Sequence, residues 1–177
     1  RAYADAILAA EIEFDVLFGP AYKGIPIAVA TATALAERGV HVGVAYNRKE
    51  AKDHGEGGSL VGDQYDSGER RRVVIIEDVT TAGTSVYETM ERLKHYPHVD
   101  VIGLLVSVDR QERGRSEKSA LTELSETFGL KTAAIIKLED LIEALESGIA
   151  AGDPWCAGID KGLVEKIRGY YSSYGGL

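Results

Sequence analysis

Four apolar residues, from Val73 to Ile76, are followed at once by two carboxylates, Glu77 and Asp78. A short run without polar residues is typical of a strand that is buried on both faces of a parallel sheet. Open α/β sheets bind their ligands at the carboxyl ends of such strands, and adjacent carboxylates accept hydrogen bonds from the vicinal hydroxyls of a sugar. This segment therefore predicts an α/β fold with a sugar-binding site at one edge of its sheet.

The residues after the acidic pair are small and rich in hydroxyl groups, and a helical pattern begins at Val86. Backbone amides at the start of a helix bind anions, and Gly83 allows the backbone to approach one closely. A Thr/Ser cap can also close a strand-to-helix turn without any ligand, and residues 81–85 alone do not decide between the two interpretations. Together with the strand and the acidic pair, they predict a phosphate site made of Val79, Thr80, Thr81, Ala82, Gly83, Thr84 and Ser85.

Composition narrows the class of protein. The chain has 177 residues, 45% hydrophobic and 27% charged, which is enough for a single α/β domain over residues 1–177. Its net charge of −8 argues against a nucleic-acid binder, which usually carries a basic face. Cys156 is the only cysteine, so no intrachain disulfide can form. No apolar stretch approaches the roughly 20 residues of a membrane span, so we expect a soluble, cytoplasmic protein with no membrane partner.

Short apolar runs and helical patterns alternate along the chain. Strands are expected at residues 14–18, 40–46, 73–76, 101–108 and 133–136. Helices are expected at residues 1–10, 26–38, 85–94, 119–128, 138–146 and 162–168. Residues 47–62 are charged and glycine-rich and are expected to form a long loop, and residues 170–177 a flexible tail. The alternation predicts a doubly wound, mainly parallel sheet flanked by helices.

A second candidate site is the charged segment at residues 47–58. It carries Arg48, Lys49, Lys52 and His54, followed by three glycines that would let it move. Such a loop could close over a leaving anion. A charge run more often only faces water, so a solvated surface loop is the alternative interpretation.

A third candidate site follows the first expected strand, in the string FGPAYKGIP at residues 18–26. Gly19 and Gly24 permit unusual backbone angles, and Lys23 places a cation beside backbone amides, which suits a diphosphate. An ordinary strand-to-helix turn with an exposed lysine explains the spacing equally well, and the choice stays open here.

A fourth candidate site is the string DRQERG at residues 109–114, directly after the expected strand at 101–108. Arg110 has a planar, fork-shaped donor group that can recognise a carboxylate or pyrimidine carbonyls with two parallel hydrogen bonds. A surface salt bridge with Glu112 or Asp109 is the alternative.

Taken together, these motifs resemble those of a known enzyme family. The strand, acidic pair and T-x-G-T turn of residues 73–85 are similar to the phosphoribosyl-pyrophosphate (PRPP) signature of the type I phosphoribosyltransferases. The string NRKEAKDHGEGG at residues 47–58 is similar, almost residue for residue, to the mobile catalytic loop of the orotate phosphoribosyltransferases. The resemblance covers residues 11–150. It implies the type I phosphoribosyltransferase fold and the transfer of the phosphoribosyl group of PRPP to orotate, giving orotidine 5′-monophosphate and pyrophosphate in pyrimidine synthesis.

The resemblance also implies a role for each candidate residue. The positions that would contact PRPP are Tyr22, Lys23, Arg48, Lys49, Lys52, His54, Glu77, Asp78, Val79, Thr80, Thr81, Ala82, Gly83, Thr84 and Ser85. The positions on which catalysis would depend are Arg48, Lys52, His54 and Asp78. Orotate would contact Thr81 and Arg110. Glu77 stands where many members of the family carry aspartate, and both residues present a carboxylate.

Mg²⁺ is the cofactor that the resemblance implies, carried by PRPP without a protein side chain as a direct metal ligand. A homodimer with shared active sites is also implied. In it Arg48, Lys52 and His54 reach into the neighbouring subunit's site and Lys49 serves its own. Members of the family carry a further amino-terminal stretch before the position of Arg1, which forms part of a hood over the base, so we expect a partly missing hood.

Two other functions remain open. A phosphoribosyltransferase for another base would share the PRPP signature, but would not need the loop at residues 47–58 or an arginine at position 110. A non-catalytic, PRPP-sensing regulator would keep the phosphate site and lose the cations of the loop. Such a regulator would usually show a basic nucleic-acid face, which this acidic chain lacks.

Overall fold

A computed structural model describes residues 1–48, 60–63 and 69–176. Within these ranges the strands form one sheet in the order β3-β2-β1-β4-β5-β6. The strands are β1 (Val16–Phe18), β2 (Gly43–Asn47), β3 (Leu60–Gly62), β4 (Arg71–Thr80), β5 (Val99–Asp109) and β6 (Lys131–Lys137). All neighbouring strands are parallel except β2 and β3, which are antiparallel. The mainly parallel sheet confirms the expected fold class.

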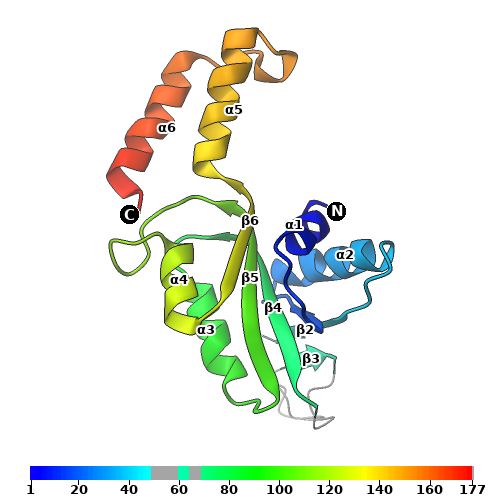
Figure 1. Cartoon of the computed structure of the whole chain (residues 1–177). Helices are drawn as coiled ribbons and strands as arrows, with labels where there is room; N and C mark the ends of the chain where they lie inside the picture. The colour runs from blue at the N-terminus through cyan, green and yellow to red at the C-terminus, as the bar shows by residue number, and fades with distance from the viewer. Residues whose placement is uncertain (49–59, 64–68, 177) are drawn as a thin grey trace.

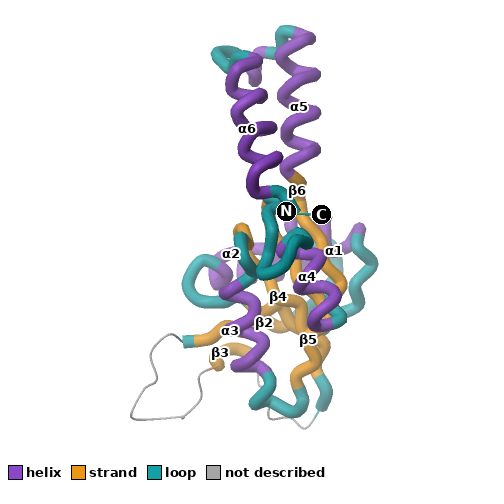
Figure 2. The backbone as a smooth tube through the Cα atoms, turned by 90° about the vertical axis from the view of Figure 1, so that its left-hand side faces the viewer, coloured by secondary structure: helices purple, strands orange, loops and turns teal. Residues whose placement is uncertain are grey.

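Helices cover both faces of the sheet (Figures 1 and 2). On one side lie α1 (Ala2–Ala9) and α2 (Gly24–Ala36), and on the other α3 (Thr84–Leu93) and α4 (Ala120–Phe128). The central strand β4 alternates between the two layers: Val74 and Ile76 pack in the α1 and α2 core, whereas Val73 and Ile75 pack in the α3 and α4 core. All four side chains are fully buried, as the apolar run predicts for a strand covered on both sides.

The chain ends in a pair of helices that project from the sheet. Figure 1 shows α5 (Leu138–Ala151) rising from the end of β6, and α6 (Lys161–Tyr174) running back beside it. A short 3₁₀ helix, η1 (Pro154–Cys156), lies in the connection between them. The pair has an apolar cluster of its own, made of Ile142, Leu145, Cys156 and Val164. The end of α6 therefore returns to the edge of the sheet where the strands β4 and β5 end.

The structure corrects three of the expectations. Within the expected loop at residues 47–62, Leu60–Gly62 forms the edge strand β3 by pairing with β2. The strand β4 continues through Glu77 and Asp78 to Thr80, because β5 keeps pairing with it that far. The expected flexible tail from Tyr170 is wrong, because α6 continues to Tyr174 and the residues after it bond to the loop that follows β5.

No helix in the described part of the chain is both long and apolar enough to cross a membrane.

Candidate active site at the carboxyl edge of the sheet

The carboxyl ends of β1, β2, β4 and β5 all meet at one edge of the sheet, because these strands are parallel. The motif after β1, the acidic pair of β4 and the arginine after β5 are therefore neighbours in space. One direct contact joins the first two: the ammonium of Lys23 lies 2.8 Å from Oδ2 of Asp78. The two segments are far apart in the sequence, and the sheet brings them to a single site.

The acidic pair lies on a part of β4 that extends beyond β1. The pairing of β1 with β4 ends where Phe18 lies opposite Ile75, so Glu77 has no β1 residue beside it. The side chain of Tyr3 contacts β4 beyond the end of β1: its hydroxyl donates a hydrogen bond of 2.8 Å to the carbonyl oxygen of Glu77. On β5, the hydroxyl of Ser107 donates to the carbonyl of the next residue, Asp78. The backbone that carries both carboxylates is thus held from two sides.

The pKa values of the two carboxyl groups are shifted in opposite directions. Glu77 is only 7% exposed, and burial raises its pKa, although a hydrogen bond from Ser85 acts in the opposite direction. Burial acts on Asp78 in the same sense, but hydrogen bonds from Lys23 and from the Val79 amide outweigh it, so the pKa of Asp78 is lowered. Asp78 is therefore a fixed anion, whereas Glu77 takes up a proton more readily than an exposed glutamate.

The turn between β4 and α3 has the shape of an anion site. Gly83 precedes the first residue of α3 and has φ of 73°, in the left-handed region. A Cβ atom there would lie 3.1 Å from Cδ1 of Leu124, so glycine suits both the backbone angle and the space. Thr81, Thr84 and Ser85 are exposed around the helix start, where backbone amides lack partners within the helix. Hydroxyls and amides there could hold a phosphate.

The turn after β1 is folded back tightly on itself. A Cβ atom on Gly19 would lie 2.3 Å from the carbonyl oxygen of Gly24, which explains why both positions are glycine. The side-chain oxygen of Asn47, at the end of β2, accepts a hydrogen bond of 3.0 Å from the amide of Ala21. This contact ties the turn to the neighbouring strand. The side chain of Lys23 remains 79% exposed while it contacts Asp78, so its charge is accessible to an incoming anion.

Arg110 leaves the end of β5 and makes the ion pair with Glu112 that the sequence left open as an alternative. Its Nη2 atom also donates a hydrogen bond of 2.9 Å to the hydroxyl of Tyr170, on α6. The side chain of Arg110 is 38% exposed, so it can still meet a ligand. A role in binding the base stays a prediction.

Three candidate residues lie outside the described part of the chain: Lys49, Lys52 and His54. Arg48 is described and follows β2 directly. The structure thus places the residues after β1, β4 and β5 at one edge, together with the start of the charged segment. Within residues 1–48, 60–63 and 69–176, no three His, Cys, Asp or Glu side chains are arranged to hold a metal ion.

Reasoning from the sequence missed the contacts by which Tyr3, Asn47, Ser107 and Tyr170 support the site. A signal for Tyr3 existed, because it is the one aromatic residue in an alanine-rich amino-terminal helix. The contacts of the other residues depend on tertiary structure, which periodicity and motif spacing do not report.

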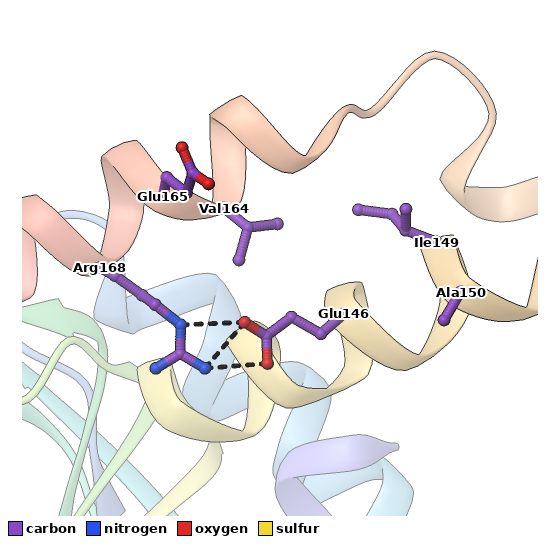
Figure 3. Close-up of a pocket in the computed structure, with 6 residues that line it drawn as sticks. All are labelled: Glu146, Ile149, Ala150, Val164, Glu165 and Arg168. Atoms are coloured by element: carbon purple, nitrogen blue, oxygen red, sulfur yellow. Dashed lines mark hydrogen bonds and ion pairs between the residues drawn. The ribbon is translucent and has the colours of Figure 1, made fainter.

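A separate hollow of about 340 Å³ lies between α5 and α6 (Figure 3). The residues that line it are Glu146, Ile149, Ala150, Val164, Glu165 and Arg168. Arg168 lies on one side and forms a bidentate ion pair with Glu146. Its Nε atom lies 2.9 Å from Oε1 and its Nη2 atom 2.8 Å from Oε2. None of the sequence motifs contributes to this hollow, and it belongs to the packing of the helix pair.

Comparison with known proteins identifies the family of the chain. The family model of the phosphoribosyl transferase domain matches residues 1–133. The orotate phosphoribosyltransferase of Clostridium acetobutylicum is 51% identical over 164 residues, which cover 92% of this chain and 71% of that protein. The orotate phosphoribosyltransferase of Salmonella paratyphi A is 47% identical over 176 residues, covering 99% and 76%.

A solved structure extends the likeness to three dimensions. The orotate phosphoribosyltransferase of Francisella tularensis matches 98% of this chain and 77% of its own, with a TM-score of 0.78 and 31% sequence identity. The chain has the type I phosphoribosyltransferase fold, and it belongs to the orotate phosphoribosyltransferases.

Proposed function

We propose that this chain transfers the 5-phosphoribosyl group of PRPP to orotate. In this reaction the bond between C1′ of the ribose and the pyrophosphate oxygen breaks, and a bond from C1′ to a ring nitrogen of orotate forms as that nitrogen gives up its proton. The products are orotidine 5′-monophosphate and pyrophosphate. The observation that carries the proposal is the convergence of the acidic pair, the hydroxyl-rich start of α3 and Lys23 at one edge of the sheet. The names of the relatives support orotate as the base.

Acidic and basic side chains would bind different parts of PRPP. Glu77 and Asp78 would accept hydrogen bonds from the ribose hydroxyls, and the helix start at residues 81–85 would hold the 5′-phosphate. Lys23 would turn from Asp78 toward the pyrophosphate, which its exposure allows. Positive charge grows on the sugar and negative charge on the leaving group as the bond breaks, so the protein mainly positions and neutralises. No covalent nucleophile is needed.

The cations of the segment at residues 47–58 complete the proposal. Arg48, Lys49, Lys52 and His54 would surround the leaving pyrophosphate, and His54 would either pass a proton to the leaving oxygen or donate a plain hydrogen bond to it. Mg²⁺ fits the site as a companion of PRPP. Glu77 and Asp78 offer carboxylate oxygens beside the ribose, and this cation usually keeps several waters and shares substrate phosphates.

We further propose a two-fold homodimer with shared sites, in which Arg48, Lys52 and His54 serve the neighbouring subunit. Lys49 would serve its own subunit. Arg48 follows β2 directly, and Lys49, Lys52 and His54 come shortly after it in the sequence. We also propose that the protein acts in the cytoplasm, where pyrimidine precursors are made. The two alternatives, a phosphoribosyltransferase for another base and a PRPP-sensing regulator, predict different outcomes in the first experiment below.

Base selectivity tests the proposed reaction. The full natural chain, including any residues that precede Arg1, is assayed with Mg-PRPP and with orotate, uracil, adenine or hypoxanthine. We expect orotate to be used at least about a hundredfold better than the others, because the loss of a charged hydrogen-bond partner costs roughly 2 to 3 kcal/mol. Equal rates with uracil would contradict the orotate proposal. Binding of PRPP without turnover of any base would favour the regulator.

Complementation tests the shared site. Chains with Lys52→Ala and with Asp78→Asn are each expected to be nearly inactive. If the two are unfolded and refolded together, about half of the dimers are mixed, and each mixed dimer has one intact site, so activity returns to roughly a quarter of the wild-type value. Native mass spectrometry confirms that mixed dimers have formed. Mixed dimers with no more activity than the separate variants would show that the loop serves its own subunit.

A further inference from the structure

Three side chains form a closed triangle at the point where α6 meets the loop after β5. Nη2 of Arg110 donates to the hydroxyl of Tyr170 at 2.9 Å and pairs with Oε1 of Glu112. The hydroxyl of Tyr170 in turn donates to the same oxygen of Glu112. The guanidinium carbon also lies 6.0 Å from the centre of the Tyr170 ring. Each of the three groups thus fixes the other two.

The triangle leaves most of the guanidinium available. Both hydrogen-bonding contacts that Arg110 makes with described residues use Nη2. A guanidinium has five N–H donors in one plane, so the donors on Nε and Nη1 can still bond to a ligand, each through its own hydrogen bond because they point in different directions. Glu112 is 13% exposed, whereas Arg110 is 38% exposed. The triangle therefore orients the remaining donors of Arg110 without covering them.

The end of α6 is anchored to the loop that carries Arg110. The Arg113 amide donates to the carbonyl of Tyr174 at 2.9 Å, and the Gly176 amide donates to the carbonyl of Gln111 at 2.8 Å. Gly175 forms an isolated antiparallel bridge with Glu112. A Cβ atom on Gly176 would lie 2.3 Å from the Ser119 amide nitrogen, so glycine allows this close approach. These backbone contacts between residues 174–176 and residues 111–113 therefore hold Tyr170 next to Arg110 and Glu112.

We propose that Tyr170 and Glu112 are positioning residues for Arg110, and that the carboxy-terminal helix thereby helps to set the affinity for the base. The inference rests on the proposed function, because the proposed ligand of the Nε and Nη1 donors is the carboxylate or a ring carbonyl of orotate. It adds a part of the chain, residues 170–176, that lies outside the family motifs and beyond the matched domain.

The test removes one hydroxyl. Tyr170→Phe keeps the ring, its contact with Tyr174 at 4.7 Å and its position near the guanidinium, and it deletes only the hydrogen bonds. We expect KM for orotate to rise about fivefold to tenfold, with KM for PRPP and kcat within about twofold of wild type. Tyr174→Phe is the matched control, because it removes a hydroxyl from the same helix, and we expect no change in either KM.

A second variant separates positioning from general damage to the fold. In an Arg110→Ala background, Tyr170→Phe should have no further effect on KM for orotate, because the group it positions is gone. The same five- to tenfold rise in that background would overturn the inference. So would an equal rise in both KM values or an unchanged KM for orotate in Tyr170→Phe alone. A wild-type chain that consumes no orotate would overturn the proposed function, and this inference with it.

Discussion

Two ion pairs connect the ends of the β1 and β4 segments, one at each edge of the sheet, and they are built differently. At the amino edge, Arg72 contacts Asp15 through Nη2 at 3.0 Å and Nε at 3.2 Å, and its own amide donates to the same carboxylate at 2.8 Å. At the carboxyl edge, Lys23 contacts Asp78 through one hydrogen bond of 2.8 Å and stays 79% exposed. The first pair has several bonds and includes the backbone, whereas the second is single and open to an incoming ligand.

The difference extends to the surroundings of the two pairs. At the amino edge, Arg72 also pairs with the carboxylate of Glu13 at 3.0 Å. At the carboxyl edge, side chains such as Tyr3, Ser107 and Asn47 bond to backbone groups and hold the chain in place. The side chains of Lys23 and Asp78 in front of them are 79% and 32% exposed. We infer from this comparison that one edge serves stability and the other function, and this division can be tested from both sides.

The largest effect is expected from Asp78→Asn, which keeps the shape of the side chain and removes its charge. We expect kcat/KM for PRPP to fall roughly a hundredfold, since losing a charged hydrogen-bond acceptor costs about 2 to 3 kcal/mol. The free energy of unfolding should change by less than about 1 kcal/mol, because the bond to Lys23 is exposed and screened by solvent. Steady-state kinetics and urea denaturation measure the two quantities. A variant that lost stability instead of activity would break the comparison.

A smaller effect is expected from the ionisation of Glu77. Burial raises its pKa above the ordinary 4.5, so the carboxyl group takes up a proton as the pH falls while Asp78, with its lowered pKa, stays charged. We expect KM for PRPP to rise about tenfold on the acid side as one acceptor for the ribose is lost.

The phosphates of PRPP also titrate, so Glu77→Gln is the necessary comparison. This variant shares the titration of the ligand and lacks that of the side chain. Its KM for PRPP should be higher at neutral pH and should change less on the acid side than that of the wild type. If KM for PRPP rose equally in both proteins as the pH falls, Glu77 would not titrate over the pH range of the assay. Asp78 would then be the carboxylate that matters at this edge.

The functional edge was more readily predicted from sequence than the scaffold behind it. An apolar run, an acidic pair and a glycine before a helix are local patterns, and residues 73–85 form a strand, a turn and a helix start in that order, although β4 continues to Thr80. The contact from Tyr3 to Glu77 joins positions that are 74 residues apart, and that from Arg110 to Tyr170 joins positions 60 apart. Such contacts depend on where β1 ends and on where α6 returns, and neither has a local signal.

The tail illustrates the same limit. Its Tyr, Ser and Gly composition indicates a segment that frays, but backbone hydrogen bonds in both directions join it to the loop at residues 111–113. Similarly, the short strand β3 exists because β2 offers it an antiparallel edge. In both places a tertiary partner overrides the intrinsic preference of the local sequence.

Removing the support behind the acidic pair should give an intermediate effect. Tyr3→Phe deletes the hydroxyl that bonds to the Glu77 carbonyl and leaves the aromatic ring. Burial raises the pKa of Tyr3, so its hydroxyl is a donor throughout the neutral range. We expect KM for PRPP to rise about fivefold, which corresponds to one hydrogen bond of about 1 kcal/mol, while KM for orotate changes less. Ser107→Ala should act in the same direction. If both variants bind PRPP like the wild type, the backbone of the pair needs no outside support.

The smallest effect, and one confined to stability, is expected from Asp15→Asn at the amino edge. Hydrogen bonding to the Arg72 side chain lowers the pKa of Asp15 below its ordinary value of 3.8. A lowered pKa means that the stabilisation is present above the unfolded-state pKa and is lost as the pH falls through the folded-state value. Because the side chain of Arg72 is 43% exposed, we expect the variant to lose only about 1 kcal/mol of unfolding free energy at neutral pH.

The pH dependence and the activity decide whether this edge is purely structural. Urea denaturation of wild type and Asp15→Asn should give curves that converge as the pH falls below the lowered pKa of Asp15, because both side chains are then neutral. A stability difference that persisted there would come from packing rather than from the ion pair. Over the neutral range kcat/KM for PRPP should stay within about twofold of wild type, since Asp15 lies at the opposite ends of β1 and β4 from Asp78. A large loss of activity in Asp15→Asn would mean that the two edges are coupled through β4, and the division between them would have to be abandoned.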